Sequence, residues 1–80
     1  MEVDNEGEIM AIVKDRLKSA RKIKDLKQKE LEAMSGIPQN TISRIELGKN
    51  PEISTRTLAA LARALNVSAD YLLGLKDEPQ

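Results

Sequence analysis

Four polar residues on one short stretch have side chains that can hydrogen-bond to the edges of DNA bases: Gln39, Asn40, Ser43 and Arg44. Asn and Gln pair bidentately with adenine, Arg pairs with guanine, and Ser bonds to either kind of edge. Singly, such residues are ordinary on a helix surface. Here they alternate with Ile42 and Ile45 at helical spacing, which predicts one apolar inner face and one free polar face.

The elements that would position these side chains are two short helices joined by a tight turn. Residues 28–35 are predicted to form a helix with Leu31 and Met34 facing inward, and Gly36 follows at once. A glycine suits the positive φ at a helix C-terminus. The next helix is predicted over about residues 38–47, because proline is tolerated in a first turn. This spacing is typical of a helix-turn-helix.

Three further helices are predicted around this pair. The first covers about residues 8–23, with Asp4 or Asn5 as its cap and an inner stripe of Ile9, Ile12, Val13, Leu17 and Ala20. The fourth follows a cap at Ser54 and ends at a left-handed Asn66, and a short fifth follows Ser68 and ends at Gly74. We therefore expect an all-α, compact five-helix bundle. Residues 1–7 are expected to form an acidic N-terminal tail, 8–75 the domain, and 76–80 a loose polar C-terminal tail.

The composition excludes several classes of chemistry. The chain has 80 residues, 1% of them aromatic, and contains no cysteine and no histidine. Disulfides, Cys/His zinc sites and histidine acid–base catalysis are therefore excluded. Since no nucleophile–base spacing stands out either, we expect no enzyme activity, cofactor or metal. No apolar run is long enough for a membrane span and no signal peptide is visible, so we expect a cytoplasmic protein.

The formal net charge is zero, but the charges are unevenly distributed. Residues 1–15 hold five acidic residues and one basic residue, a net −4, whereas residues 16–29 hold seven basic residues and one acidic residue, a net +6. Local charge governs attraction to phosphate. The basic segment is thus compatible with nucleic-acid binding, although it could equally be a solvated helix face.

The sequence resembles the phage-repressor and Cro-like helix-turn-helix family, also called xenobiotic-response-element-type regulators, over about residues 13–75. The residues that carry the resemblance are Arg16-Leu17, Arg21, Gln28, Leu31, Gly36-Ile37, Thr41 to Glu46, Gly48-Lys49, Pro51, Leu58, Leu61-Ala62, Ala64-Leu65, Val67-Ser68 and Asp70 to Leu73. The resemblance implies a lambda-repressor-like DNA-binding domain with its third helix in the major groove.

Roles for particular residues follow from this resemblance. Base reading is expected from Gln39, Asn40, Ser43 and Arg44. Phosphate contacts are expected from Lys27, Gln28, Lys29, Thr41, Lys49 and Asn50. Gln28 also opens a helix, where free N–H groups attract anions. Arg21 and Glu46 match a pair that joins the first helix to the end of the third and, with Gly36, would support the recognition helix structurally.

Three residues depart from the family pattern. Lys27 stands where Ser or Thr usually caps the second helix, which loses a cap worth roughly 1 kcal/mol. Glu32 stands where alanine is common, and we expect its stem to bend outward because a buried unpaired carboxylate is costly. Leu47 replaces a polar phosphate contact, and is expected in the core instead.

The leading hypothesis is sequence-specific binding of double-stranded DNA by a homodimer, acting as a transcriptional repressor. Dimers of this motif read two half-sites about one helical turn apart. Tyr71, Leu72 and Leu75 are candidate dimer contacts, with Leu72 alternatively in the core. The alternative is an antitoxin that binds both operator DNA and a protein toxin.

Overall fold

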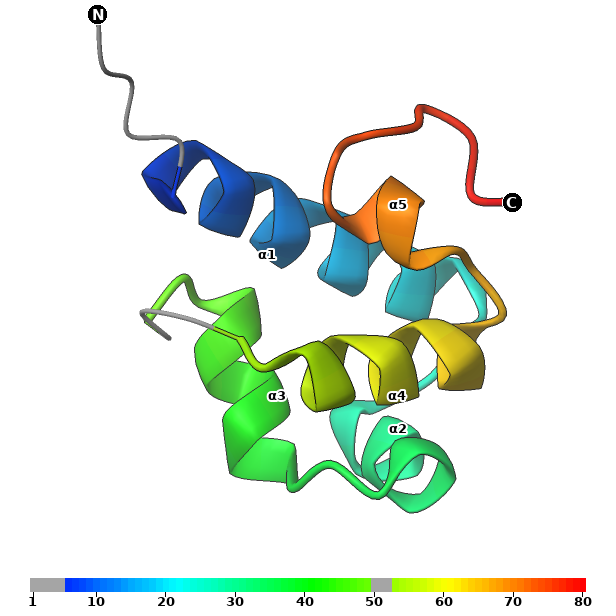
Figure 1. Cartoon of the computed structure of the whole chain (residues 1–80). Coiled ribbons are helices and arrows are strands. Elements are labelled where there is room, and N and C mark those ends of the chain that lie inside the picture. The colour runs from blue at the N-terminus through cyan, green and yellow to red at the C-terminus, as the bar shows by residue number, and fades with distance from the viewer. Residues whose placement is uncertain (1–5, 50–52) are drawn as a thin grey trace, which may run out of the picture.

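The computed structural model describes residues 6–49 and 53–80, and this part of the chain is helical with no strand (Figure 1). The expected all-α architecture is confirmed. Its helices are α1 (Glu6–Ile23), α2 (Gln28–Ser35), α3 (Gln39–Glu46), α4 (Thr55–Leu65) and α5 (Ala69–Leu72). Within the described ranges, no helix is long and apolar enough to cross a membrane.

The helices pack around one apolar core. α2 packs against α3 and α4, while α1 packs against α3, α4 and α5. Figure 1 shows α1 and α5 on one side of the molecule, α2 and α3 on the other, and α4 between them. The fully buried side chains that fill the centre are Val13, Leu17, Leu31, Ile42, Ile45, Leu61, Leu65 and Leu72. α2 and α3 are thus fixed by burying one face each, which leaves their other faces to solvent.

The ends of the helices follow local sequence signals. The hydroxyl oxygens of Ser54 and Ser68 accept hydrogen bonds from the backbone N–H groups of Thr57 and Tyr71, at 3.1 and 3.0 Å. Asn66 is left-handed, with φ 57° and ψ 42°. These three predictions are confirmed. The expected caps of α1, Asp4 and Asn5, lie outside the described residues, and α1 begins at Glu6, two residues before its predicted start.

Three apolar side chains predicted to face inward are more exposed than expected. Ile9 is 37% exposed, because α1 extends past the elements that cover its middle. Met34 is 54% exposed and lies over the small side chains of Ala60 and Ala64 on α4, which leave a shallow groove. Leu47 is 60% exposed, because it lies about 200° around the helix from the buried Ile45. The prediction that Leu47 is core is therefore wrong.

The last five residues lie against the domain instead of extending loosely. The Ser68 N–H donates to the Pro79 carbonyl at 2.7 Å, and the Gln80 amide donates to the Asn66 carbonyl at 2.9 Å. Arg16 donates to the Tyr71 carbonyl at 2.7 Å and to the Lys76 carbonyl, and its guanidinium lies 4.5 Å from the centre of the Tyr71 ring. The side chain of Arg16 therefore ties this end of the chain to α1.

Candidate nucleic-acid interface

α2 and α3 meet at a tight turn that begins with a left-handed glycine. Gly36 has φ 79° and ψ 4°, and its N–H donates to the Glu32 carbonyl at 2.8 Å. The Ser35 hydroxyl accepts from the Ile37 N–H at 3.1 Å, and Pro38 caps α3. Because Gly36 adopts the conformation that residues with a Cβ avoid, residues 36–38 suffice to join α2 to α3. α3 therefore follows α2 closely in the sequence and packs against it.

The four predicted base-reading residues lie along α3, on the surface opposite its buried isoleucines. Asn40 and Arg44 are exposed, and Gln39 and Ser43 are half-buried. Asn40 and Arg44 are four residues apart, so they lie on one face one turn apart. Gln39, Asn40 and Ser43 also line an open groove between α3 and α2, whereas Arg44 lies beyond it. The structure thus gathers all four on a single helix and three of them around one groove.

The predicted phosphate-contacting residues lie around the ends of α2 and α3. Lys27 and Lys29 are exposed on either side of Gln28, the first residue of α2, which is half-buried in the groove. Lys49 is exposed just beyond α3, and its N–H donates to the Arg44 carbonyl at 2.8 Å. Thr41 is half-buried within α3. Asn50, the remaining member of the predicted set, lies outside the described residues.

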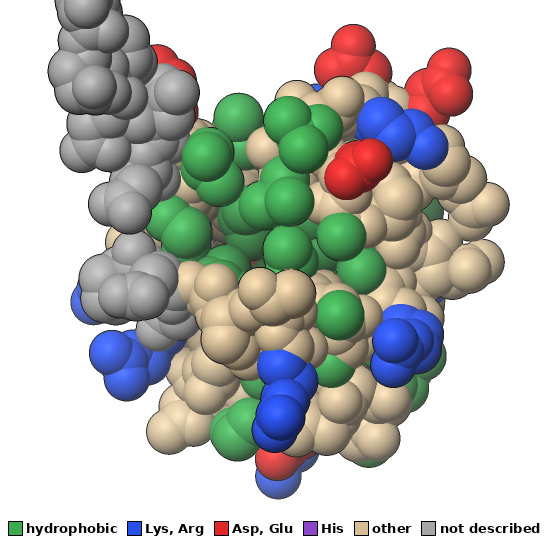
Figure 2. Space-filling view, viewed as in Figure 1, with side chains coloured by type: hydrophobic (Ala, Val, Ile, Leu, Met, Phe, Trp, Pro, Cys, Tyr) green, Lys and Arg blue, Asp and Glu red, His purple; other side chains and the backbone are tan. Residues whose placement is uncertain are grey.

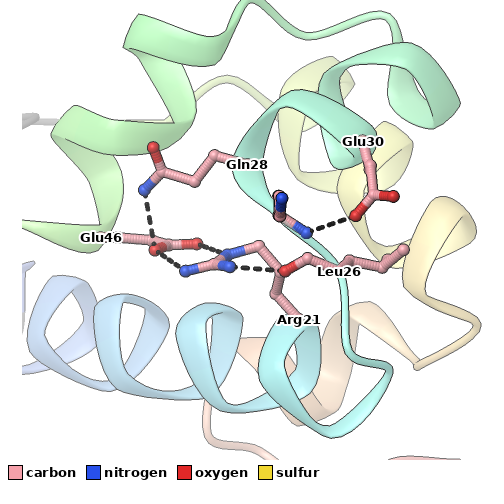
Figure 3. A network of polar contacts seen from close by, with 6 residues as sticks. Arg21, Leu26, Gln28, Glu30 and Glu46 are labelled. Carbon is pink, nitrogen blue, oxygen red and sulfur yellow. Dashed lines mark hydrogen bonds and ion pairs between the residues drawn. The ribbon is translucent and has the colours of Figure 1, made fainter.

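A buried ion pair joins α1 to the end of α3 (Figure 3). The Arg21 guanidinium donates to both carboxylate oxygens of Glu46, with Nε–Oε2 at 2.7 Å and Nη2–Oε1 at 2.9 Å. The side chains are 11% and 3% exposed. The hydrogen bond to Glu46 raises the pKa of Arg21, against the opposing effect of burial. Arg21 therefore stays charged at any physiological pH, and the pair is bidentate and largely shielded from water.

The ion pair extends to two further groups. Arg21 also donates to the Leu26 carbonyl at 2.6 Å, and the Gln28 amide nitrogen donates to Glu46 Oε1 at 3.1 Å (Figure 3). A carboxamide nitrogen carries two hydrogens. Because Glu46 accepts one of these hydrogens, the Gln28 carboxamide must be oriented with its nitrogen toward Glu46. Among the described residues, the second N–H of Gln28 has no hydrogen-bond acceptor, and it lies at the start of α2.

The start of α2 has an unusual cap. The side chain of Lys27 cannot accept a hydrogen bond, so α2 lacks the hydroxyl cap that the family resemblance led us to look for at this position. The Glu30 carboxylate instead accepts from the Lys27 N–H at 2.7 Å. This bond is one half of a capping box, and the spacing of Glu30 three residues after Lys27 was its sequence signal. A negative charge in this first turn also interacts favourably with the helix dipole.

Sequence reasoning missed one residue of the groove. Glu32 was expected only to bend outward, but its half-buried side chain lines the groove together with Gln28 and Gln39. The signal that could have found it is its position one turn after Gln28 on the same face of α2. The groove, of about 470 Å³, is completed by Pro38, Asn40 and Ser43. An acidic side chain therefore lies among the polar residues of the candidate interface.

Known proteins match this chain over most of its length. The sequence profile of the helix-turn-helix family matches residues 17–72. The HTH-type transcriptional regulator PrtR of Pseudomonas aeruginosa is 44% identical over 57 residues, which cover 71% of this chain and 22% of that protein. The control protein C.SmaI of Serratia marcescens is 36% identical over 74 residues, covering 89% of this chain and 87% of the relative. An uncharacterised HTH-type transcriptional regulator of Haemophilus influenzae is 35% identical over 75 residues, covering 82% and 76%. The chain thus spans only about a fifth of PrtR but most of the other two.

Proposed function

The chain belongs to the helix-turn-helix family of DNA-binding transcription regulators, and we propose that it binds a specific double-stranded operator with α3 in the major groove. The family resemblance seen in the sequence is confirmed by this membership. The observation that carries the proposal is the division of α3 into two faces. Ile42 and Ile45 are fully buried, while Asn40 and Arg44 are exposed on the opposite surface.

Base recognition would come from α3. Gln39 and Asn40 lie in its first turn, which is the part of a recognition helix that reaches the base edges. Arg44 lies one turn further on, where a bidentate contact to guanine O6 and N7 suits its planar fork of donors. Ser43, half-buried between them in the groove, can bond to a base edge or a neighbouring phosphate.

Phosphate contacts would set the register of α3 on the duplex. Gln28 offers its second amide N–H beside the free backbone N–H groups at the start of α2. Lys27, Lys29 and Lys49 add exposed positive charge at two edges of the interface, and Thr41 and Asn50 complete the proposed set. The Arg21–Glu46 pair would act indirectly, by holding Gln28 and the end of α3 in place.

A second copy of the chain would complete the operator-binding unit. Figure 2 shows apolar side chains gathered on a surface between α1, α4 and α5. Leu75 is 72% exposed. The neighbouring Gly74 packs against α1, because a Cβ added there would come within 2.9 Å of the Ile12 side chain. The chain just after α5 therefore shares this surface with α1. Of the candidate dimer contacts, Leu72 is fully buried and is therefore part of the core. The exposed apolar side chains of Leu75 and Ile9 are the proposed contact of a homodimer.

Occupation of a promoter by such a dimer would repress transcription, and the protein would act by binding alone, without catalysis. A regulator of this kind works where the chromosome lies, which in bacteria, the source of the relatives named above, is the cytoplasm. A toxin partner is the alternative proposed from the sequence, and it would add a protein ligand to the same DNA-binding domain.

The experiment that tests the proposal is selection from a random duplex library with the purified chain at near-physiological salt. We expect a palindromic motif with half-site centres about 10 base pairs apart. Enrichment of no sequence, with only salt-sensitive bulk binding, would contradict specific operator recognition. A reporter gene driven by a promoter that carries the selected motif then gives the direction of regulation. Increased expression would contradict the repressor role and leave operator binding intact.

A further inference from the structure

One acidic side chain lies inside the surface proposed to read DNA. Glu32 on α2 is half-buried and lines the open groove with Gln28 of its own helix and with Gln39, Asn40 and Ser43 of α3. Gln28 and Glu32 are four residues apart, so both project from one face of α2 toward α3. A duplex docked on α3 would therefore cover the Glu32 carboxylate.

The other two acidic residues of the α2–α3 unit are already engaged. Glu30 accepts from the Lys27 N–H, and Glu46 is held by Arg21 and Gln28. Within residues 6–49 and 53–80, the Glu32 carboxylate has neither a hydrogen-bond donor nor an ion-pair partner, although its backbone carbonyl accepts from Gly36. Glu32 is thus the acid of this unit whose oxygens remain available to a ligand.

An ionised carboxylate only accepts hydrogen bonds, and this limits what it can meet in a DNA groove. Phosphate oxygens, guanine O6 and N7, and thymine O4 are acceptors, so the carboxylate is repelled by all of them. The major-groove donors are the amino groups at cytosine N4 and adenine N6. A carboxylate covered by DNA without such a donor would lose its water and gain no partner, which is unfavourable.

Given the proposed DNA-binding function, we propose that Glu32 is a specificity-determining residue that accepts a hydrogen bond from the exocyclic amino group of cytosine or adenine. It acts mainly by rejecting sequences, because a guanine or thymine at that position leaves the carboxylate desolvated and unpaired. Specificity would then come from α2 as well as from the recognition helix α3. In the free protein, the same carboxylate costs little because the groove is open to water.

The test compares the sequences that the wild-type chain, Glu32→Gln and Glu32→Ala select from one random duplex library, followed by competition binding on single-base variants. Glu32→Gln keeps the shape of the side chain and adds a donor, so guanine and thymine become acceptable. We expect both variants to lose discrimination by about tenfold at one base pair of each half-site, equivalent to about 1.4 kcal/mol. Preferences at the other positions should stay the same.

The matched control is Glu78→Gln, which removes the same charge from the exposed C-terminal tail, on the opposite side of the molecule from α3 (Figure 1). It should raise affinity on all sequences to a similar small extent and leave the motif unchanged. Thermal unfolding of each variant checks that the fold is retained. An unchanged motif in both Glu32 variants, or a shift equal to that of Glu78→Gln, would overturn the role of Glu32 while operator binding stands. If the wild-type chain selected no motif, the proposed function itself would fall.

Discussion

The Arg21–Glu46 pair offers the most informative perturbation, because it bears on both stability and DNA binding. The Glu46 carboxylate is 3% exposed in the intact pair, and Arg21→Ala removes its cationic partner. Among the described residues, the Gln28 amide then remains as its hydrogen-bond donor, at 3.1 Å. Breaking a buried pair by removing one partner costs about 3–5 kcal/mol. For a domain of this size each kcal/mol lowers Tm by about 4–8 °C, so we expect a fall of at least about 12 °C.

Urea unfolding followed by far-UV circular dichroism measures the loss in free energy of unfolding, and thermal unfolding measures the fall in Tm. Arg21→Lys should fall between the wild type and Arg21→Ala, because an ammonium keeps the charge but loses the bidentate fork. Arg63→Ala is the matched control: Arg63 is exposed in the last turn of α4, and its removal should change the free energy of unfolding by less than about 0.5 kcal/mol. A similarly small change in Arg21→Ala would refute the energetic reasoning.

A double substitution separates the two roles of the pair. Replacing a buried ion pair with apolar residues of similar volume is often neutral or stabilising, so Arg21→Met with Glu46→Leu should recover the stability that Arg21→Ala loses. DNA affinity should remain reduced, because leucine offers no acceptor to hold the Gln28 amide. Recovery of both stability and affinity would show that Glu46 has no part in positioning Gln28.

Four further predictions concern single residues. Arg44→Ala should weaken binding to the best operator by about 1–3 kcal/mol and relax preference at one base pair, and uniform weakening in competition assays would remove its base-reading role. Lys49→Ala should weaken all sites alike and reduce the salt slope of log K by about one, so an unchanged slope would remove Lys49 from the phosphate contacts. Gly36→Ala should lower the free energy of unfolding by about 1–2 kcal/mol through backbone strain alone, since an added Cβ meets nothing within 4 Å at φ 79°, and an unchanged urea midpoint would argue against that strain. Leu75→Glu should shift sedimentation toward the monomer, and a dimer that persists would place the contact elsewhere.

Much of the fold could be predicted because its signals are local. Ser54, Ser68, Gly36 and Asn66 each satisfy or end a helix through bonds and dihedral angles that involve only neighbouring residues. The observed bounds of α2, Gln28 and Ser35, agree with the predicted residues 28–35, and Gly36 is the stop signal that follows Ser35. The candidate interface also follows from one helix, because the spacing of Ile42 and Ile45 determines which face of α3 is free.

Other features depended on what lies across from a side chain. Met34 and Leu47 are as apolar as Leu31, yet Met34 lines a groove with alanines of α4 and Leu47 is 60% exposed at the end of α3. Residues 76–80 fold against the domain through the backbone N–H of Ser68 and the backbone carbonyl of Asn66. These groups are distant from Pro79 and Gln80 in the sequence and come close to them only in the folded chain. Periodicity within one helix carries no information about its neighbour.

The sequence by itself determined the helices, the turn at Gly36 and the polar face of α3, because each depends on contacts within a few residues. The pairing of Arg21 with Glu46 was expected from the family resemblance, but the tertiary structure alone decided that Gln28 joins this buried pair and that Glu32 opens onto the groove beside Gln39. The physical reason is that burial and pairing of a charge are set by side chains brought together from α1, α2 and α3. The same residue type, glutamate, thus fixes the recognition helix at one position and faces the proposed DNA surface at another.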